Sequence, residues 1–281
     1  GFNWDVMDEL LTKTGKVKLD DPKTEEIGHI KKIVQSDIEK HTLFFVGTNN
    51  INWVSSDCGV TVSAFNQGRP IDDLYFHPDD PKWIIATAYT LEDESEVKYK
   101  ELFYSTNGGF SWKFLTDFVI QVSWGSVNYD HIEYGVPKAR VIVTRHSDAN
   151  PENETSESQK RLDLVFSDDF FMTPVVSLTD VEQFIIAGNS VYVSKVEYKD
   201  KEPSSKIKED GKEHKTETKQ RNLVLMYAST KHFTYQFSPV KFNADPDLAH
   251  NHYSFITIDS NHTIVLNVNH HTPEGVVGDL Y

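Results

Sequence analysis

The chain has 281 residues, and 38% of them are hydrophobic, which is enough to bury the core of one large domain or two ordinary ones. It carries 43 acidic and 28 basic side chains, for a formal net charge of −15. This balance argues against a nucleic-acid binder, which needs clustered Lys and Arg, and against contact with an anionic membrane surface. The single cysteine, Cys58, excludes a disulfide within the chain and a cysteine-based zinc site.

The chain opens with Gly1-Phe2-Asn3-Trp4, without a Met or a signal peptide, so we expect it to be processed or truncated. No apolar run approaches the ~18 residues that a membrane span needs. Residues 22–40 are the one segment with plausible helical periodicity, and we predict a helix there.

Short β-rich runs bounded by turn signals dominate the rest of the chain. "DDLYFHP" and "KWIIATAY" flank a Pro-Asp-Asp-Pro bend, "EQFIIAG" precedes "NSVYVSKVEY", and "YSFITID" precedes "IVLNVN". Hairpins of this kind predict an all-β fold, either a barrel, a sandwich or a propeller.

A repeated turn of the form Ser-x-Asp/Asn-x-Gly-x-x-Trp favours the propeller. The copies, complete and degenerate, are Ser105, Asn107, Gly109 and Trp112; Ser55, Asp57 and Gly59, with Val62 at the ring position; Ser167 and Asp169, with Phe171 where glycine belongs; a fainter copy from Ala228; and the second half alone at Gly1 and Trp4. The intervals from Ser55 to Ser105, Ser167 and Ala228 are 50, 62 and 61 residues. Four-stranded propeller blades repeat at roughly 40 to 50 residues plus insertions.

The residue types explain the turn. We expect the Ser hydroxyl and the Asp or Asn side chain to bond to backbone groups of a hairpin turn within a blade. Glycine supplies a positive φ, and the ring packs between neighbouring blades. The carboxylates are therefore predicted to be structural, and no catalytic residue is assigned.

These turns resemble the Asp-boxes of sialidases, some glycosidases and sortilin-type vacuolar protein-sorting receptors. The text between the turns resembles the receptors: "IDDLYFHPDDPKWIIATAY", "ELFYSTNGGFSWKFLTDFVIQVSWGS" and "YSFITIDSNHTIVLNVNHHTPEGVVGDLY". The resemblance covers most of residues 42–281. It implies a ten-bladed propeller of four-stranded blades, followed in the intact receptor by cysteine-rich modules and one membrane span.

Residues 1–281 would then be a partial propeller of about five blades, roughly half of the whole. A complete five-bladed ring is the alternative. The resemblance implies a luminal domain in the Golgi and endosomal system that captures peptide or propeptide segments of soluble cargo proteins for transport to the endosome or vacuole. It implies no cofactor, no metal and no membrane contact by this segment.

In the family, a basic residue on one strand can hold a peptide carboxylate in the propeller tunnel. That position falls near Leu223 here, which cannot pair with a carboxylate, while Arg221 lies two residues away. Ser194, in "VYVSKVEY", matches a small polar position on the neighbouring strand. The resemblance therefore offers Ser194 and Arg221 as ligand-binding candidates, and Arg221 can equally be part of a charged loop.

Two charged insertions interrupt the pattern, at residues 146–161 and 199–221; we expect solvated loops, with a partner-docking tail as the alternative for the second. Two glycosylation sequons occur, at Asn153 inside the first insertion and at Asn261 in a bend between strands. Their use would place folding in the secretory lumen.

If Ile258 pairs with Thr263, His250 falls opposite His271. This pair can be a pH sensor, part of a zinc site or two ordinary loop histidines. Cys58 can be an unpaired thiol or a partner for a cysteine outside this chain.

An enzyme is the alternative class. A sialidase needs three converging arginines, but the chain has five in all and three of them lie beside charged or polar loops. A two-carboxylate glycosidase is not excluded by composition. No Gly-x-Ser-x-Gly, phosphate loop or His-Glu-x-x-His motif occurs. We therefore predict a binding module, with an Asp-box hydrolase or a free-standing five-bladed interaction scaffold as alternatives.

Overall fold

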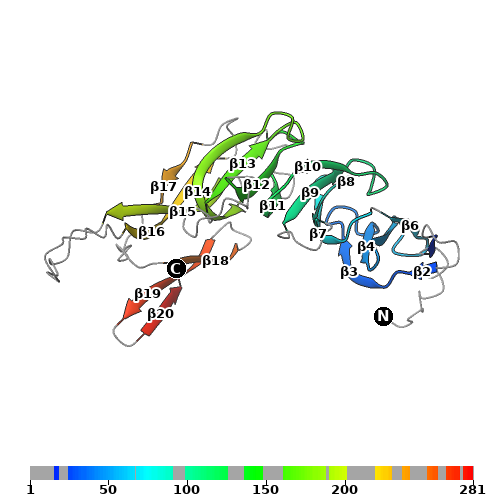
Figure 1. The fold of residues 1–281 in the computed structure, drawn as a ribbon, viewed down its shortest axis with the longest axis horizontal. Helices are drawn as coiled ribbons and strands as arrows, with labels where there is room; N and C mark the ends of the chain where they lie inside the picture. The colour runs from blue at the N-terminus through cyan, green and yellow to red at the C-terminus, as the bar shows by residue number, and fades with distance from the viewer. Residues whose placement is uncertain are drawn as a thin grey trace, which may run out of the picture.

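The computed structural model describes residues 16–18, 25–66, 68–90, 99–125, 136–147, 161–187, 190–200, 219–229, 236–240, 252–258, 264–272 and 275–280. All regular structure in these ranges is β-strand, and every strand pairing is antiparallel (Figure 1). The predicted all-β class is confirmed. No helix in the described part of the chain is long and apolar enough to cross a membrane.

The first two large sheets are four-stranded meanders, in which consecutive strands pair with one another. The first meander consists of β3 (Ile30–Gln35), β4 (Leu43–Gly47), β5 (Ile51–Ser55) and β6 (Ser63–Asn66). The second consists of β7 (Ile71–His77), β8 (Asp80–Tyr89), β9 (Lys100–Ser105) and β10 (Lys113–Thr116).

The next sheet has seven strands because two meanders share one long strand. It consists of β11 (Val119–Trp124), β12 (Val141–His146), β13 (Leu162–Ser167), β14 (Val175–Ala187), β15 (Ser190–Asp200), β16 (Lys219–Ser229) and β17 (Ser238–Pro239). The strand β14 pairs with β13 as far as Val181 and with β15 from Val181 onward. Asp180, with φ of 59°, marks the change of partner. The third meander is therefore β11–β14 and the fourth is β14–β17.

Two smaller sheets complete the described part. The strands β18 (His252–Ile258), β19 (Ile264–Thr272) and β20 (Gly275–Leu280) form a three-stranded sheet, and β1 (Lys16–Lys18) pairs with β2 (Glu25–Ile27). The strands β15 and β16 reach two to three residues further into the predicted 199–221 insertion than the sequence indicated, since Asp200 pairs with Lys219.

The helix predicted for residues 22–40 is wrong. Residues 25–27 and 30–35 are the strands β2 and β3, residues 36–42 form a turn closed by the Ser36 N–H to Thr42 carbonyl bond, and residues 22–24 lie outside the described part. The isoleucines and valine of this segment repeat at near-helical spacing. They are β-branched, however, and Val34 packs on the apolar cluster around Phe44, so tertiary contacts prevail over the pattern.

Consecutive meanders pack face to face, in chain order. On β8, Ile84 belongs to a cluster with Phe44 of the first meander, whereas its neighbour Ile85 belongs to a cluster with Val122 and Val141 of the third. Adjacent residues of a strand point to opposite faces, so one strand supplies both interfaces. Full burial of each such side chain is worth about 1.5–3 kcal/mol, and this apolar packing holds the row of meanders in Figure 1 together.

Because neighbouring strands run antiparallel, the connections between strands alternate between the two ends of each meander. The turn from first to second strand and the turn from third to fourth strand lie at one end, where the Cys58 N–H bonds to the His41 carbonyl and the Gly108 N–H to the Lys82 carbonyl. The connections between second and third strands leave from the other end. Both charged insertions are connections of this second kind.

Candidate ligand-binding site

Three turns, each joining the third strand of a meander to the fourth, share one hydrogen-bond pattern. In the first turn the Ser55 hydroxyl accepts from the Gly59 N–H at 2.7 Å and donates to the Asp57 carboxylate at 2.8 Å. Asp57 in turn accepts from the Thr61 N–H at 2.8 Å and from the Thr61 hydroxyl at 2.6 Å. A buried serine thus anchors the turn, and the partly exposed Asp57 side chain closes it.

The other two turns repeat this pattern. Ser105 accepts from the Gly109 N–H and donates to Asn107, both at 2.9 Å. Ser167 accepts from the Phe171 N–H at 2.8 Å and donates to Asp169 at 2.7 Å. The three serines end β5, β9 and β13, so they occupy the same place in their meanders.

Hydrogen bonds stabilise the charged form of the two turn carboxylates. The Thr61 hydroxyl and N–H, followed by the Ser55 hydroxyl, lower the pKa of Asp57. The Ser167 hydroxyl and then the Thr173 hydroxyl lower the pKa of Asp169 from 3.8 to about 2. Both carboxylates therefore accept the hydrogen bonds of their turns in the ionised form.

Two consecutive residues of each turn take positive φ. At the second of these positions Gly59 has φ of 87° and Gly109 has φ of 94°, whereas Phe171 has φ of 64°. The left-handed conformation costs a non-glycine residue roughly 1–2 kcal/mol. The preceding residue, Phe170, also has a positive φ, of 56°, and its ring stacks on Tyr104 of the second meander with centroids 4.1 Å apart.

The Trp112 ring of the second turn likewise packs against the preceding meander. Trp112 packs edge-on against Phe44 of β4, with ring centroids 6.3 Å apart, and its indole N–H donates to the Gly109 carbonyl at 2.7 Å. A Cβ on Gly109 would lie 2.7 Å from the Phe44 ring. The expected packing of the ring between neighbouring units is therefore found at this turn.

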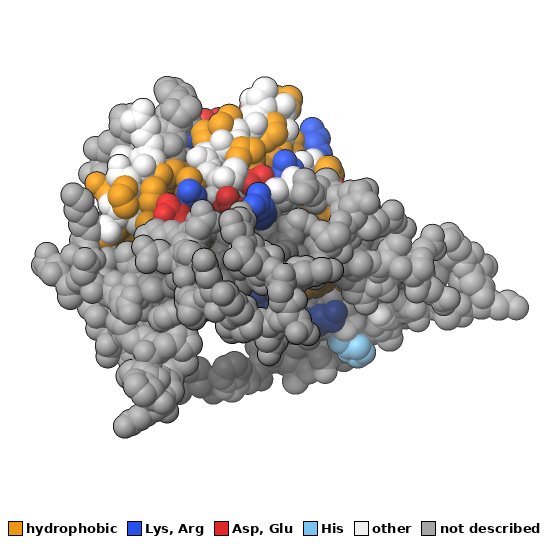
Figure 2. Space-filling view, turned by 60° about the vertical axis from the view of Figure 1, so that its left-hand side comes forward, with side chains coloured by type: hydrophobic (Ala, Val, Ile, Leu, Met, Phe, Trp, Pro, Cys, Tyr) orange, Lys and Arg blue, Asp and Glu red, His pale blue; other side chains and the backbone are white. Residues whose placement is uncertain are grey.

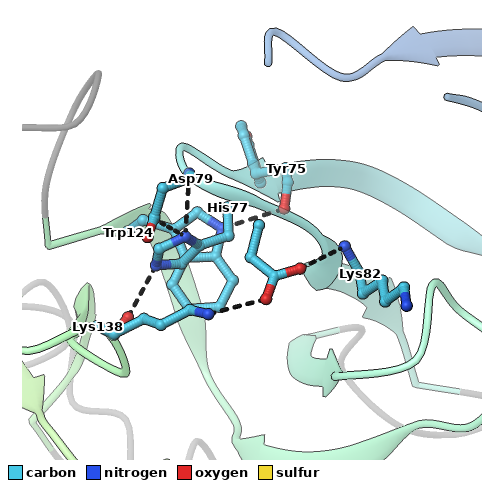
Figure 3. A network of polar contacts seen from close by, with 7 residues as sticks. Tyr75, His77, Asp79, Lys82, Trp124 and Lys138 are labelled. Carbon is cyan, nitrogen blue, oxygen red and sulfur yellow. Dashed lines mark hydrogen bonds and ion pairs between the residues drawn. The ribbon is translucent and has the colours of Figure 1, made fainter. Parts of the chain in front are cut away.

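A buried network joins the second and third meanders (Figure 3). The Nε2 atom of His77, the last residue of β7, lies 2.8 Å from the Lys138 carbonyl, and its Nδ1 contacts the Asp79 carboxylate. The Trp124 ring packs edge-on against the imidazole at 4.6 Å and donates its N–H to the Tyr75 carbonyl at 3.2 Å. The His-Pro-Asp-Asp bend of the sequence is thus a joint between meanders.

A second joint lies within the third meander and was not found from the sequence. The Arg140 side chain is 1% exposed, and its Nε and Nη2 atoms donate to the two Asp168 oxygens at 2.6 and 2.8 Å. Its guanidinium also lies over the Phe166 ring at 5.0 Å. The signal that was available is an arginine placed directly before the apolar run "VIV".

Polar contacts link the first strands of successive meanders. Lys32 of β3 forms an ion pair with Asp73 of β7 at 2.7 Å, and the bond from Trp124 of β11 to the Tyr75 carbonyl joins β11 to β7. The Gln121 amide of β11 bonds to both the carbonyl and the N–H of Phe184 in β14, at 2.7 and 3.0 Å. In Figure 1, β3, β7 and β11 lie on the lower side of the row, and β6 and β10 on the upper side.

These linked strands carry an exposed surface of mixed character, which we call the first-strand surface and define as Lys32, Asp73, Tyr75 and Ile120. Tyr75 is 40% exposed and Ile120 is 50% exposed, while the side chains of Lys32 and Asp73 are 46% and 37% exposed. Burial, followed by the charge on Asp73, raises the pKa of Tyr75, so its hydroxyl stays protonated. The surface offers apolar contact, one hydroxyl donor and a charge pair.

The two ligand-binding residues suggested by the resemblance are not brought together. Ser194 of β15 is 0% exposed and pairs with Leu225, and its hydroxyl has no hydrogen-bond partner among the described residues. Arg221 of β16 pairs with Tyr198, four positions along the ladder, or about 13 Å. Their role in binding remains a prediction.

Several predicted residues lie outside the described part: Asn153, Asn261, His250, the fainter turn from Ala228 beyond Ser229, and the first four residues. His271 lies in β19 and pairs with Val276 of β20. Ile258 pairs with Ile264 rather than Thr263, with an irregularity after Phe255. Cys58 is an exposed free thiol. The described residues contain no group of three His, Cys, Asp or Glu side chains suited to a metal.

One protein-family model matches most of the chain. The model of the Sortilin-Vps10 family, described as "Sortilin, neurotensin receptor 3", matches residues 14–281. No curated protein matches the chain at a significant level.

Solved structures resemble the chain only distantly. The GH74 xyloglucanase from Xanthomonas campestris is 15% identical with a TM-score of 0.44 over 99% of this chain and 40% of its own. A GH74 enzyme from Niastella koreensis is 13% identical with a TM-score of 0.42 over 85% of this chain and 33% of its own. YCF48 from Cyanidioschyzon merolae is 8% identical with a TM-score of 0.41, over 90% and 71%. This chain thus spans 33% and 40% of the two GH74 chains, and likeness at this level carries no functional argument.

Proposed function

The chain belongs to the Sortilin-Vps10 family, and from this membership we propose that it is part of the luminal, ligand-binding β-propeller of a sorting receptor. Its four meanders are blades, and the three serine-anchored turns are Asp-boxes. The second and third of these turns pack on the blade before their own. The resemblance in sequence implies ten blades in the whole propeller, of which this chain supplies about half. The sequence of the complete gene product tests that number directly.

The cargo is a peptide or propeptide segment of a soluble protein carried from the Golgi towards the endosome or vacuole. The observation that carries this assignment is the family match over residues 14–281. The first-strand surface supports it, because Tyr75 and Ile120 offer apolar contact and the Lys32–Asp73 pair offers charges of both signs. A peptide can bind such a surface through its backbone and alternate side chains without any chemical step.

We place no catalytic role on the chain. Its turn carboxylates are engaged by Ser and Thr hydroxyls, and the buried Arg140 is engaged by Asp168. Turnover of aryl glycosides or aryl sialosides by the purified protein, abolished by substitution of one carboxylate, would replace this proposal with the hydrolase alternative.

Capture of soluble luminal proteins tests the binding function. The immobilised chain is incubated with a luminal fraction at neutral pH, and the captured proteins are then displayed as peptide arrays to find the bound segments. The double variant Tyr75→Ser/Ile120→Ser should lose capture, whereas Tyr89→Ser/Tyr227→Ser, which removes two equally exposed rings elsewhere, should retain it. Equal capture by both variants would reject the first-strand surface, and no short bound segment on the arrays would reject the cargo class.

A further inference from the structure

The described part of the face in Figure 2 carries hydrophobic, acidic and basic side chains intermixed. A chemically distinct feature lies in the second serine-anchored turn, where Asn107 is followed by Gly108. This is the only Asn-Gly pair among the 281 residues. In the other two turns an aspartate holds the position of Asn107, and it is followed by Cys58 and Phe170. The second turn alone therefore combines a side-chain amide with a glycine directly after it.

An asparagine before a glycine is prone to deamidation. The backbone nitrogen of the following residue attacks the side-chain carbon Cγ, and glycine has no Cβ to obstruct that attack. The nitrogen loses its proton to water or hydroxide, the N–Cγ bond forms, and the Cγ–Nδ2 bond breaks as Nδ2 takes up a proton and leaves as ammonia. Water then opens the five-membered imide, and cleavage at Cγ gives aspartate whereas cleavage at the main-chain carbonyl gives isoaspartate. In sum, one water is consumed and one ammonia is released, and nothing is oxidised or reduced.

Three hydrogen bonds hold the Asn107 amide in the closed turn. Its Oδ1 accepts from the Ser105 hydroxyl and from the Ser111 N–H, both at 2.9 Å, and its Nδ2 donates to the Ser111 hydroxyl at 2.9 Å. The attacking nitrogen is engaged as well, because the Gly108 N–H donates to the Lys82 carbonyl at 2.9 Å. The two donors at Oδ1 favour negative charge on that oxygen, but the nitrogen that must attack holds its proton against another acceptor. Attack on Cγ therefore requires that the bond to Lys82 break first.

The pair is open to solvent on its outer side. Asn107 is exposed, and a Cβ built on Gly108 would meet no atom within 4 Å. Water and hydroxide therefore reach the reacting groups, so protection comes from the hydrogen bonds of the turn rather than from burial. Local opening of such a turn costs less free energy than unfolding of the whole domain.

We propose that Asn107 is a site of deamidation and that the closed turn protects it, so that conversion proceeds from molecules in which this turn has opened. The bonds to Ser105, Ser111 and Lys82 set the fraction of open molecules, and the Asn-Gly pair sets the rate within that fraction.

The two products have opposite effects on the turn. An aspartate fits the closed turn, because Asp57 and Asp169 hold the same position and accept from threonine hydroxyls. An isoaspartate lengthens the main chain by one carbon between Ser105 and Gly109, whose 2.9 Å bond anchors the turn. It should therefore open the turn and loosen the packing of the second meander on the first, which this turn supports.

Peptide mapping by mass spectrometry measures the conversion of Asn107 in the full chain during incubation in mildly alkaline buffer, and isoaspartyl methyltransferase labels the isoaspartate. The pair should convert rapidly in concentrated urea. The folded chain should convert more slowly by about thirtyfold or more, because only its open fraction reacts.

The variant Ser105→Ala removes the anchor of the turn. It should speed conversion of the folded chain by about thirtyfold, the factor expected when one buried donor loses its acceptor. Hydrogen exchange of the Gly108 amide should accelerate by the same factor, because both processes need the bond to Lys82 broken. Thr106→Ala, at the exposed neighbouring position, is the matched control and should change both rates by less than about twofold. In urea all three chains should convert equally, because their Asn-Gly pair is the same.

Equal conversion of the folded and the urea-treated chain, absence of conversion in urea, or equal rates in Ser105→Ala and Thr106→Ala would overturn the proposal. So would faster exchange at Gly108 without faster conversion in Ser105→Ala, because opening of the turn would then not control the reaction. None of these measurements involves cargo, so their outcome is independent of the proposed receptor function.

Discussion

Replacing Ser55 by alanine tests the role of the turn serines most directly. The Ser55 hydroxyl accepts the hydrogen of the Gly59 amide at 2.7 Å, and both residues are buried. Alanine fits the same space but leaves that N–H without its acceptor. An unsatisfied buried donor costs about 1–3 kcal/mol, so we expect Ser55→Ala to lower the free energy of unfolding by about 2 kcal/mol.

Two measurements report this loss. Calorimetry should show a melting temperature lower by roughly 4 °C, since about 1 kcal/mol shifts a large domain by roughly 2 °C. Hydrogen exchange of the Gly59 amide should accelerate by about thirtyfold, because about 1.4 kcal/mol corresponds to a factor of ten. The exchange measurement is the more specific of the two, because it monitors the Gly59 N–H, the one donor that loses its acceptor in the variant.

The neighbouring serine supplies the control. Ser56 is exposed, and its alanine variant should unfold within about 0.5 kcal/mol of the parent with unchanged exchange at Gly59. Ser105→Ala should behave like Ser55→Ala, because Ser105 accepts from the Gly109 amide at 2.9 Å. If Ser55→Ala matches Ser56→Ala in both measurements, the anchoring role of the turn serines is refuted.

Three further predictions concern charges. Arg140→Met keeps the buried aliphatic part of the side chain but leaves Asp168 without its partner, and should lower the free energy of unfolding in urea by about 3 kcal/mol. The double variant Arg140→Met/Asp168→Asn should recover part of this loss, and an equal loss in the double variant would contradict the pairing. Asn107→Asp lets the Ser111 hydroxyl donate to a carboxylate, as the threonine hydroxyls do in the other two turns. It should raise the free energy of unfolding by about 0.5–1 kcal/mol in the same assay, and a lower urea midpoint would contradict this prediction. Asp169 has its pKa lowered to about 2 in the folded chain, so its stabilising contribution is complete above about pH 4 and is lost as pH falls towards 2; the urea midpoint of Asp169→Asn should lack this part of the acid dependence, and parallel acid profiles would contradict it.

The sequence predicted the strands and the repeated turns because their signals are local. Short runs of β-forming residues bounded by turn residues indicate β7, β8, β14, β15, β18 and β19. The Ser-x-Asp/Asn-x-Gly spacing indicates the first two turns. The third turn forms even with Phe171 at the glycine position, since stacking of Phe170 on Tyr104 supports it from another meander. That support could not be predicted from the turn alone.

The features that the sequence did not predict depend instead on contacts between residues far apart in the chain. The helix expected at residues 22–40 is a strand at Val34 because that side chain packs on residues far along the chain. The sharing of β14 by two meanders and the burial of Arg140 also depend on long-range packing. The first-strand surface arises from three strands that begin 41 and 48 residues apart in the sequence, and no local pattern marks its members.

The continuous strand β14 makes the joint between the third and fourth meanders unlike the joints before it. The first and second meanders, and the second and third, adhere through side-chain packing and a few polar bonds, so a pull along the row can separate them by peeling one face from another. The third and fourth instead share the continuous strand β14, which is hydrogen-bonded to β13 along its first part and to β15 along its second. Under tension these two should rupture as a single mechanical unit, and the chain should first yield on the amino-terminal side of β11.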